Sequence, residues 1–220
     1  MIFLDSANIN EIRKFNRLGI IRGVTTNPSI MKKDGISDIF GTLEQIVEEM
    51  TPYPVFAEIT TNDSPIVMIH EAVNLREYLG NTVGIKIPIH GPNGELFNLE
   101  VIRELEKYKG VIVNATACMS AQQCLLAVMS GASYVSLFGG RINNTGINCI
   151  DEIKKIRKLF DRFDINSKLI IGSTREVLNI TEWLEKGADF VTVTPDLLGK
   201  TIINPSTKEV VSQFLSDVWS

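Results

Sequence analysis

A lysine stands inside the apolar segment 83–89 (VGIKIPI) of this 220-residue chain. The segment is short, rich in β-branched residues and closed by a proline, which predicts a buried strand. An ammonium group that leaves water without a partner is costly, so it either pairs or loses its proton. A neutral buried amine forms Schiff bases with carbonyl compounds, and this chemistry makes Lys86 a candidate nucleophile. The alternative is an ordinary strand-end lysine that extends to solvent or pairs with an acid.

Polar residues also occur late in other short apolar segments, on the face opposite the apolar side chains. Side chains of a strand alternate between its two faces, so a shared register can direct them into one cavity. Each has a structural alternative: Asp5 as a cap for a helix that begins near Asn8, and Thr25 to Asn27 as turn chemistry before Pro28. The repetition of the register favours a cavity around Lys86 lined by Asp5, Thr25, Asn27, Glu58, Asn114 and Thr116.

A second group of residues suits a phosphate. A predicted strand ends in Gly172-Ser173-Thr174-Arg175, and the preceding one runs from Phe138 through two glycines into Arg141. Planar guanidinium groups bind phosphate with two hydrogen bonds, and a hydroxyl and backbone N–H groups add donors. The alternative is that each arginine pairs with a surface acid. Their position on successive loops favours an anion site made by Arg141, Ser173 and Arg175.

The elements that position these residues alternate along the whole chain. We expect strands at 2–5, 21–26, 54–60, 82–88, 111–116, 133–138, 168–172 and 189–193. Segments with helical periodicity follow them at about 8–18, 37–50, 63–79, 95–108, 119–130, 147–163, 175–186 and 206–218. This pattern predicts a single (β/α)₈ barrel domain over residues 1–220, whose active site lies where the strands end. An open doubly wound sheet is the alternative, but the chain lacks its glycine-rich phosphate loop.

The last segment, 206–218, predicts an amphipathic helix with Val210, Val211, Phe214, Leu215 and Trp219 on one side. Such a helix either closes the bottom of the barrel or docks on a neighbouring subunit.

Composition excludes several classes of function. The net charge is −4, and the basic residues are scattered, which argues against nucleic acid and anionic membranes as partners. No apolar run approaches the ~18–20 residues of a membrane span. Three cysteines without a paired motif, and a start without a basic leader, indicate a cytoplasmic protein with thiols in the core. His70 and His90 are isolated, so we expect neither a metal nor another cofactor.

Several motifs together resemble the transaldolase superfamily, in particular its short branch that includes fructose 6-phosphate aldolase. They occur in the family's order along nearly the whole chain, and the second and third together are highly specific. They are the segments LDSA at 4–7, GVTTNPS at 23–29, IKIP at 85–88, NAT at 114–116, GGRI at 139–142 and GSTR at 172–175. One departure is Thr174, where an aromatic residue is usual.

The resemblance implies a (β/α)₈ fold and a role for each candidate residue. Lys86 would form the Schiff base, and Asp5 would handle the proton of the C4 hydroxyl. Glu58 and Thr116 would act through an ordered water, Asn27 and Asn114 would hold the dihydroxyacetone unit, and the anion site would bind the substrate phosphate. The iminium nitrogen accepts the electrons of the broken carbon–carbon bond, so no metal is needed.

Two positions separate the transferases of this family from its aldolases. By resemblance, the short aldolases carry glutamine at the position of Glu58 and tyrosine at that of Phe138, whereas transaldolases carry glutamate and phenylalanine. A phenylalanine excludes the water or proton donor that a tyrosine would offer, so the enamine survives until an acceptor arrives. We therefore expect a transaldolase that passes dihydroxyacetone from fructose 6-phosphate or sedoheptulose 7-phosphate to erythrose 4-phosphate or glyceraldehyde 3-phosphate.

Other functions stay open. They are a lyase that releases dihydroxyacetone, an enzyme acting on sulfonated sugars, and a sugar-phosphate binder without activity. The binder would lack the lysine or the acid, and here Lys86 and Asp5 are both present. The resemblance also implies a homo-oligomer, a pentamer or decamer, with subunit contacts made by the C-terminal helix.

Overall fold

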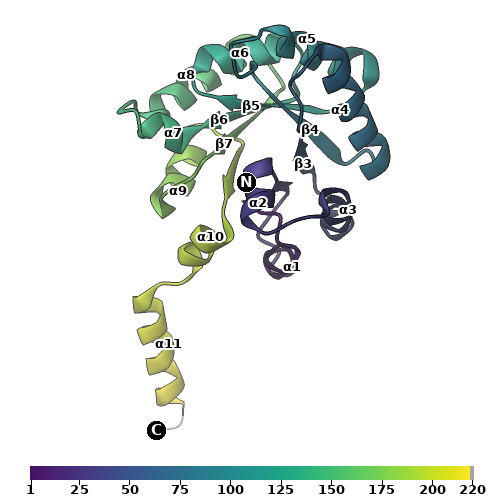
Figure 1. Ribbon diagram of the computed structural model, residues 1–220. Helices are drawn as coiled ribbons and strands as arrows, with labels where there is room; N and C mark the ends of the chain where they lie inside the picture. Colours follow the sequence, from purple (N-terminus) through teal and green to yellow (C-terminus); the bar gives the residue numbers. More distant parts are fainter. Residues whose placement is uncertain (219–220) are drawn as a thin grey trace.

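The computed structural model describes residues 1–218, and parallel strands in it close into a barrel (Figure 1). Each strand pairs with the next along the chain, and β8 pairs with β1. The strands are β1 (Ile2–Asp5), β2 (Val24–Thr25), β3 (Val55–Glu58), β4 (Val83–Pro88), β5 (Val113–Cys118), β6 (Tyr134–Phe138), β7 (Lys168–Gly172) and β8 (Phe190–Val193). The predicted (β/α)₈ barrel is confirmed.

The predicted helices form between the strands and after the last one, with ends shifted by a few residues. They are α1 (Ile9–Arg17), α3 (Ile39–Met50), α4 (Pro65–Leu79), α5 (Phe97–Glu104), which continues as a π-helical turn (Leu105–Lys109), α6 (Ala121–Met129), α8 (Cys149–Arg162), α9 (Val177–Glu185) and α11 (Pro205–Asp217). Asn8, not Asp5, caps α1, since its Oδ1 accepts from the N–H groups of Asn10 and Glu11. This result leaves the Asp5 carboxylate available for the cavity.

Three further helices were not expected: α2 (Pro28–Lys33), α7 (Gly139–Asn143) and α10 (Pro195–Ile202). The first begins at a proline preceded by the cap Asn27, which accepts from the N–H of Ile30. The third begins at Pro195. Proline at the first helical position is a recognised start signal, so both could have been predicted. The five residues of α7 have no side-chain cap, and only the surrounding structure defines them.

The strands β2 and β5 differ most from their predicted ranges, while β3, β4, β6 and β8 are shorter than predicted by one to three residues. β2 has two residues in place of the predicted range 21–26, because the chain turns into α2 soon after Thr25. β5 begins later and extends to Cys118, with a shift of its register against β6 between Ala115 and Cys118. Ala117 adopts a positive φ of 60° within that shift. A left-handed residue is uncommon for alanine and marks local backbone strain beside the barrel mouth.

The barrel encloses an aromatic layer below its polar mouth. Phe3 and Phe190 stack with ring centroids 4.2 Å apart, and Phe56 packs edge-on against Tyr134 at 4.8 Å. Ile170 completes this cluster, which is separate from the larger apolar core of the protein. A Cβ on Gly23 would lie 2.8 Å from the Phe3 ring, and one on Gly84 would overlap the Phe56 ring. Because these two glycines have no side chain, there is room for the aromatic rings that lie below the cavity.

The three cysteines are buried and unpaired, as expected for core residues. Burial raises the pKa of the Cys149 thiol to about 12, which keeps it in the unreactive protonated form.

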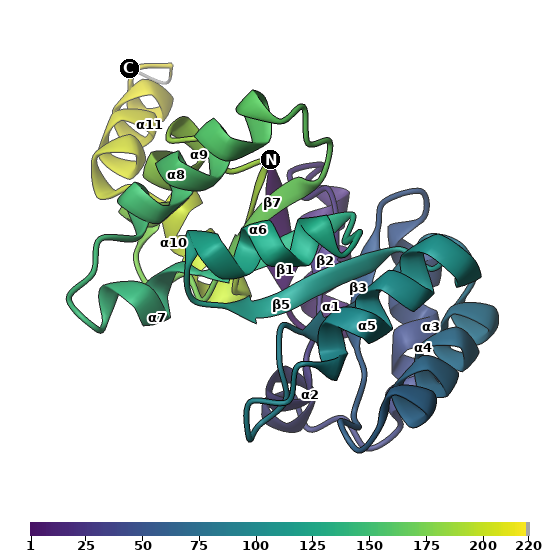
Figure 2. The ribbon, with the colours of Figure 1, turned by 90° about the horizontal axis from the view of Figure 1, so that it is seen from above.

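The C-terminal helix α11 extends away from the barrel (Figures 1 and 2). None of its residues is buried, so the alternative in which it closes the bottom of its own barrel is wrong. Val210, Val211, Phe214 and Leu215 are all exposed, and Trp219 lies outside the described residues. Among residues 1–218, no helix combines the length and apolar character that crossing a membrane requires.

The close fit of Gly84 against Phe56 predicts the effect of one added methyl group. Gly84→Ala should lower the free energy of unfolding by about 1–3 kcal/mol, because the packed ring cannot move away without displacing its neighbours. Urea unfolding measures the difference. Gly199→Ala is the matched control. Gly199 lies within the helix α10, and a Cβ there would meet no atom within 4 Å, so the free energy of unfolding should rise by about 0.5–1 kcal/mol. Equal stability of the two variants would contradict this account of the floor.

Candidate active site

The site is a cavity of about 510 Å³ at the carboxyl ends of the strands. It contains the acids of β1 and β3, the lysine of β4 and the loops that follow β6 and β7. Its walls include ten of the eleven predicted site residues: Asp5, Thr25, Asn27, Glu58, Lys86, Thr116, Phe138, Arg141, Ser173 and Arg175. The shared register of polar residues at the strand ends therefore does direct these side chains into one cavity.

Lys86 lies on the cavity wall with only 4% of its surface exposed. Its register on β4 places it beside Glu58 of β3, and Nζ lies 2.9 Å from Glu58 Oε2. The amine also donates to the carbonyl oxygen of Thr26 at 2.7 Å. The pairing with an acid that the sequence left open is thus present, and it occurs inside the cavity. Glu58 is the carboxylate in position to take a proton from this amine.

Asp5 stands at the end of β1, where Thr25 Oγ1 donates to its Oδ1 at 2.6 Å. Burial raises the pKa of the Asp5 carboxyl above its usual value, and the charges of Glu58 and Asp34 act in the same direction. The Thr25 hydrogen bond and the Lys86 charge oppose that rise in pKa. An acid with a raised pKa next to a lysine is the pattern of a group that takes and returns protons.

Asn114 departs from the prediction, because it is fully buried and does not line the cavity. Its Oδ1 accepts from Ser136 Oγ at 2.8 Å, while its Nδ2 is a buried donor without a partner in the described part of the chain. Thr116 Oγ1 is a second buried group left unpartnered there. Such groups are rare in folded proteins, and Thr116 lines the cavity that a polar ligand could enter.

The loops after β6 and β7 meet at the rim, where they bring the two arginines together with Ser173. A Cβ on Gly140 would collide with the carbonyl oxygen of Ser173, so the glycine lets the loops approach. Ser173 has a φ of 58°, and its buried Oγ has no partner within residues 1–218. Ion pairs of arginines in the described chain involve Arg13 and Arg157, so Arg141 and Arg175 are free of carboxylates there. This arrangement suits a doubly charged oxyanion.

Several cavity residues were not among the predicted ones, including Ser136, Thr192, Thr194 and Lys33. Alternation along β8 places Phe190 and Thr192 inside the barrel, as Phe190 in the aromatic layer shows. The same reasoning that found Asp5 could therefore have found Thr192. Lys33 had no such signal, since it lies at the end of the unexpected helix α2.

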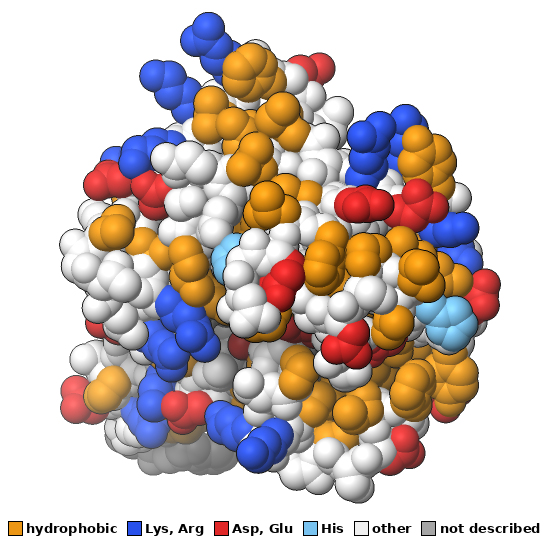
Figure 3. Space-filling view, turned by 45° about the horizontal axis from the view of Figure 1, so that its top comes forward, with side chains coloured by type: hydrophobic (Ala, Val, Ile, Leu, Met, Phe, Trp, Pro, Cys, Tyr) orange, Lys and Arg blue, Asp and Glu red, His pale blue; other side chains and the backbone are white. Residues whose placement is uncertain are grey.

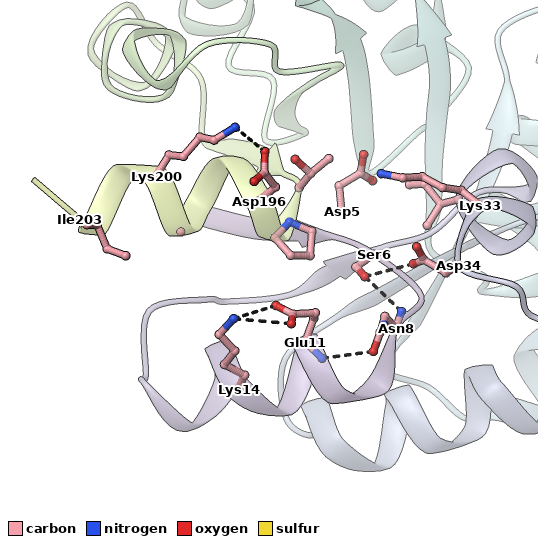
Figure 4. Close-up of a pocket in the computed structure, with 14 residues that line it drawn as sticks. Asp5, Ser6, Asn8, Glu11, Lys14, Lys33, Asp34, Asp196, Lys200 and Ile203 are labelled. Atoms are coloured by element: carbon pink, nitrogen blue, oxygen red, sulfur yellow. Dashed lines mark hydrogen bonds and ion pairs between the residues drawn. The ribbon is translucent and has the colours of Figure 1, made fainter.

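A second, more open hollow of about 700 Å³ adjoins the cavity between α1, α2 and α10 (Figure 4). It shares Asp5 and Lys33 with the first, and Figure 4 shows Lys33 extending toward the Asp5 carboxylate. Ion pairs join Lys14 to Glu11 and Lys200 to Asp196 along its walls. The convergent groups that could perform chemistry lie in the smaller cavity. No three His, Cys, Asp or Glu side chains of residues 1–218 form a metal-binding group.

Comparison with known proteins finds relatives along nearly the whole chain. A family model described as transaldolase/fructose-6-phosphate aldolase matches residues 2–218. A probable transaldolase of Methanococcus maripaludis strain S2 is 37% identical over 215 residues, covering 98% of this chain and 95% of that protein. Probable transaldolases of Dehalococcoides mccartyi and Brucella ovis are each 36% identical to this chain. Both alignments cover 98% of this chain; they cover 96% of the first protein and 94% of the second.

Solved structures with little sequence similarity share the fold. A putative phosphonomutase from Burkholderia cenocepacia superposes with a TM-score of 0.62 at 15% identity, covering 96% of this chain and 92% of its own. A thiamine phosphate pyrophosphorylase from Pyrococcus furiosus gives 0.60 at 13% identity, with 88% and 84% covered. These likenesses concern the barrel alone. The family match along nearly the whole length shows that this chain belongs to the transaldolase/fructose-6-phosphate aldolase family.

Proposed function

We propose that this protein is a transaldolase that transfers dihydroxyacetone from a ketose phosphate to an aldose phosphate through a Schiff base on Lys86. The observation that carries the proposal is the buried amine of Lys86, 2.9 Å from Glu58 in a cavity that also contains Asp5. Fructose 6-phosphate or sedoheptulose 7-phosphate would be the donor, and erythrose 4-phosphate or glyceraldehyde 3-phosphate the acceptor, as in the pentose phosphate pathway.

The reaction begins when Glu58 takes a proton from Lys86 and the neutral amine attacks the C2 carbonyl of the donor. The carbinolamine loses water with proton transfer by Glu58, assisted by the Thr116 hydroxyl, and an iminium forms. Asp5 then removes the C4 hydroxyl proton, the C3–C4 bond breaks, and its electron pair reaches the iminium nitrogen. An aldose phosphate leaves, and the three-carbon enamine stays bound to Lys86. Attack of the enamine on the acceptor aldehyde reverses these steps.

The remaining residues would hold the two ends of the donor. Thr25 and Asn27 line the cavity near Asp5, while the buried amide of Asn114 would be reached through Ser136. At the rim, Arg141, Ser173 and Arg175 would bind the phosphate. Thr174 donates its hydroxyl to the carbonyl oxygen of Thr192 and so is not free to add a donor to this anion site.

Phe138 supports a transferase over a lyase. Phe138 lines the cavity, and its ring centroid lies 5.7 Å from Cζ of the Arg141 guanidinium. The ring presents no hydroxyl to the enamine. Without a proton donor or an ordered water at that position, the enamine would persist until the acceptor binds.

A covalent intermediate predicts a trappable adduct. Treatment with fructose 6-phosphate and sodium borohydride should reduce the iminium, and mass spectrometry should find the added three-carbon or six-carbon unit on the peptide that contains Lys86. Lys86→Met should give no adduct and lose activity by at least about 10³-fold, since the nucleophile is gone. An unmodified Lys86 peptide in the active protein would refute the mechanism. Lys33→Met, which removes the other lysine of the cavity, is the matched control for specific labelling.

The transferase assignment predicts a strict need for an acceptor. Consumption of fructose 6-phosphate should rise by about 10²-fold or more when erythrose 4-phosphate is present, because the enamine is otherwise not discharged. Phe138→Tyr should increase acceptor-independent release of dihydroxyacetone. Comparable rates with and without acceptor would identify a lyase. Turnover of a sulfonated ketose in preference to the phosphate would identify the other substrate class.

We also propose a homo-oligomer in which α11 contacts a neighbouring subunit. The helix carries a row of exposed apolar side chains, and Figure 3 shows further hydrophobic side chains gathered on the side of α3 and α4, where Phe40 packs against Tyr78. Two different apolar areas on one subunit suit the head-to-tail contacts of a closed ring. Sedimentation velocity should show a pentamer or decamer for the full chain and dissociation for a chain that ends at residue 204. A monomeric full chain would contradict the proposal.

The unpaired, buried cysteines support a cytoplasmic location.

A further inference from the structure

A chain of hydroxyl groups crosses the barrel mouth from β8 through β2 to β1. Thr25 Oγ1 lies 2.6 Å from Asp5 Oδ1 and 2.6 Å from Thr192 Oγ1. The two threonines are 3% and 6% exposed, so water does not compete for these hydrogen bonds. A separate contact, from Thr174 Oγ1 to the carbonyl oxygen of Thr192 at 2.8 Å, holds the backbone of β8 at this point.

The donors in this chain follow from counting hydrogens. An ionised carboxylate only accepts, so the hydroxyl of Thr25 must donate to Asp5. That hydroxyl has a single hydrogen, which is engaged in the bond to Asp5. In the hydrogen bond between the two threonines, Thr192 must therefore be the donor. Each donation polarises the next hydroxyl, so the bond to Asp5 is stronger than Thr25 alone would make it.

The two oxygens of Asp5 thus differ. Oδ1 is occupied by Thr25, whereas Oδ2 has no hydrogen-bond partner in residues 1–218, and Asp5 lines the cavity. If Oδ1 were to take a proton, it would have to donate it to Thr25, and both threonines would have to reverse. That reversal would turn both hydroxyls and leave the Thr192 hydrogen without its present acceptor, whereas Oδ2 can take a proton with the chain unchanged.

We propose that Thr192 is a positioning residue that acts on Asp5 through Thr25 and reserves Oδ2 as the oxygen that takes and returns the substrate proton. The inference rests on the proposed role of Asp5 as acid and base. In the cleavage step the C4 O–H bond breaks and an Oδ2–H bond forms, while the C3–C4 electron pair moves to the iminium. The same proton returns to the new hydroxyl when the acceptor aldehyde is attacked.

The charges of Lys86, Glu58 and Asp34 also act on Asp5, and further charged residues line the walls around it. Lys86 of β4 and Glu58 of β3 face it across the mouth, Asp34 and Lys33 lie at the end of α2, and Arg141 and Arg175 stand at the rim. None of them makes a hydrogen bond to Asp5 within the described chain. The hydroxyl chain favours the ionised form of Asp5, so its loss should make the carboxyl titrate at higher pH.

Thr192→Val tests this, because it removes the hydroxyl and keeps the shape of the side chain. The titration of Asp5 is followed by carboxyl ¹³C NMR of the unliganded protein, with Asp5→Asn to assign the signal. The midpoint should move to higher pH in Thr192→Val and return in Thr192→Ser. Thr174→Val, which removes the hydroxyl bonded to the Thr192 backbone, should leave the midpoint in place. An unchanged midpoint in Thr192→Val, or an equal shift in Thr174→Val, would overturn the proposal.

Kinetics provide the second measurement. In Thr192→Val, kcat should fall about 3- to 30-fold with little change in KM, and the acidic limb of the kcat profile should move to higher pH. Thr192→Ser should restore both. An unshifted acidic limb would count against the role in catalysis. Failure of the unmodified protein to turn over any ketose phosphate would refute the proposed function, whereas the NMR titration would still decide whether the hydroxyl chain controls Asp5.

Discussion

The ion pair between Lys86 and Glu58 depends on neighbouring strands of a closed barrel, and the site is built around it. Two charges taken out of water cost several kcal/mol each unless geometry and further hydrogen bonds compensate. Here adjacent positions on β3 and β4 bring the groups to 2.9 Å, and the carbonyl oxygen of Thr26 accepts a further hydrogen bond from the amine. A barrel supplies such pairs at the ends of its strands, where side chains are close but a cavity remains open.

Function here is in tension with stability. Because burial raises the pKa of Asp5, this carboxyl favours the folded state at pH values below its unfolded pKa of about 3.9. That contribution is lost as the pH rises through the higher folded pKa, so the ionised Asp5 disfavours folding at neutral pH. Ala117 and Ser173, both with positive φ, also line the cavity. The aromatic layer and the continuous apolar core beneath the helices offset these costs.

Much of this could be predicted because the barrel is regular. Alternation along the strands located Asp5, Thr25, Asn27, Glu58, Lys86 and Thr116, and the motifs that follow two later strands located Arg141, Ser173 and Arg175. Errors arose where regularity fails. β2 is short because α2 follows it, and Asn114 is fully buried and bonded to Ser136, which lines the cavity in its place. Alternation along a strand tells which face of the strand a side chain occupies, but not whether that side chain reaches the surface of the cavity.

The sequence by itself determined the class of fold, the order of its elements, the family, and the residues available for Schiff-base chemistry, because these depend on residue types and their periodicity. Tertiary structure decided the contacts. It alone paired Lys86 with Glu58, joined Asp5 to Thr192 through Thr25, and left α11 outside the barrel. The reason is physical: distances between side chains on different strands are set by the geometry of the closed barrel, and the periodicity of each strand does not encode those distances.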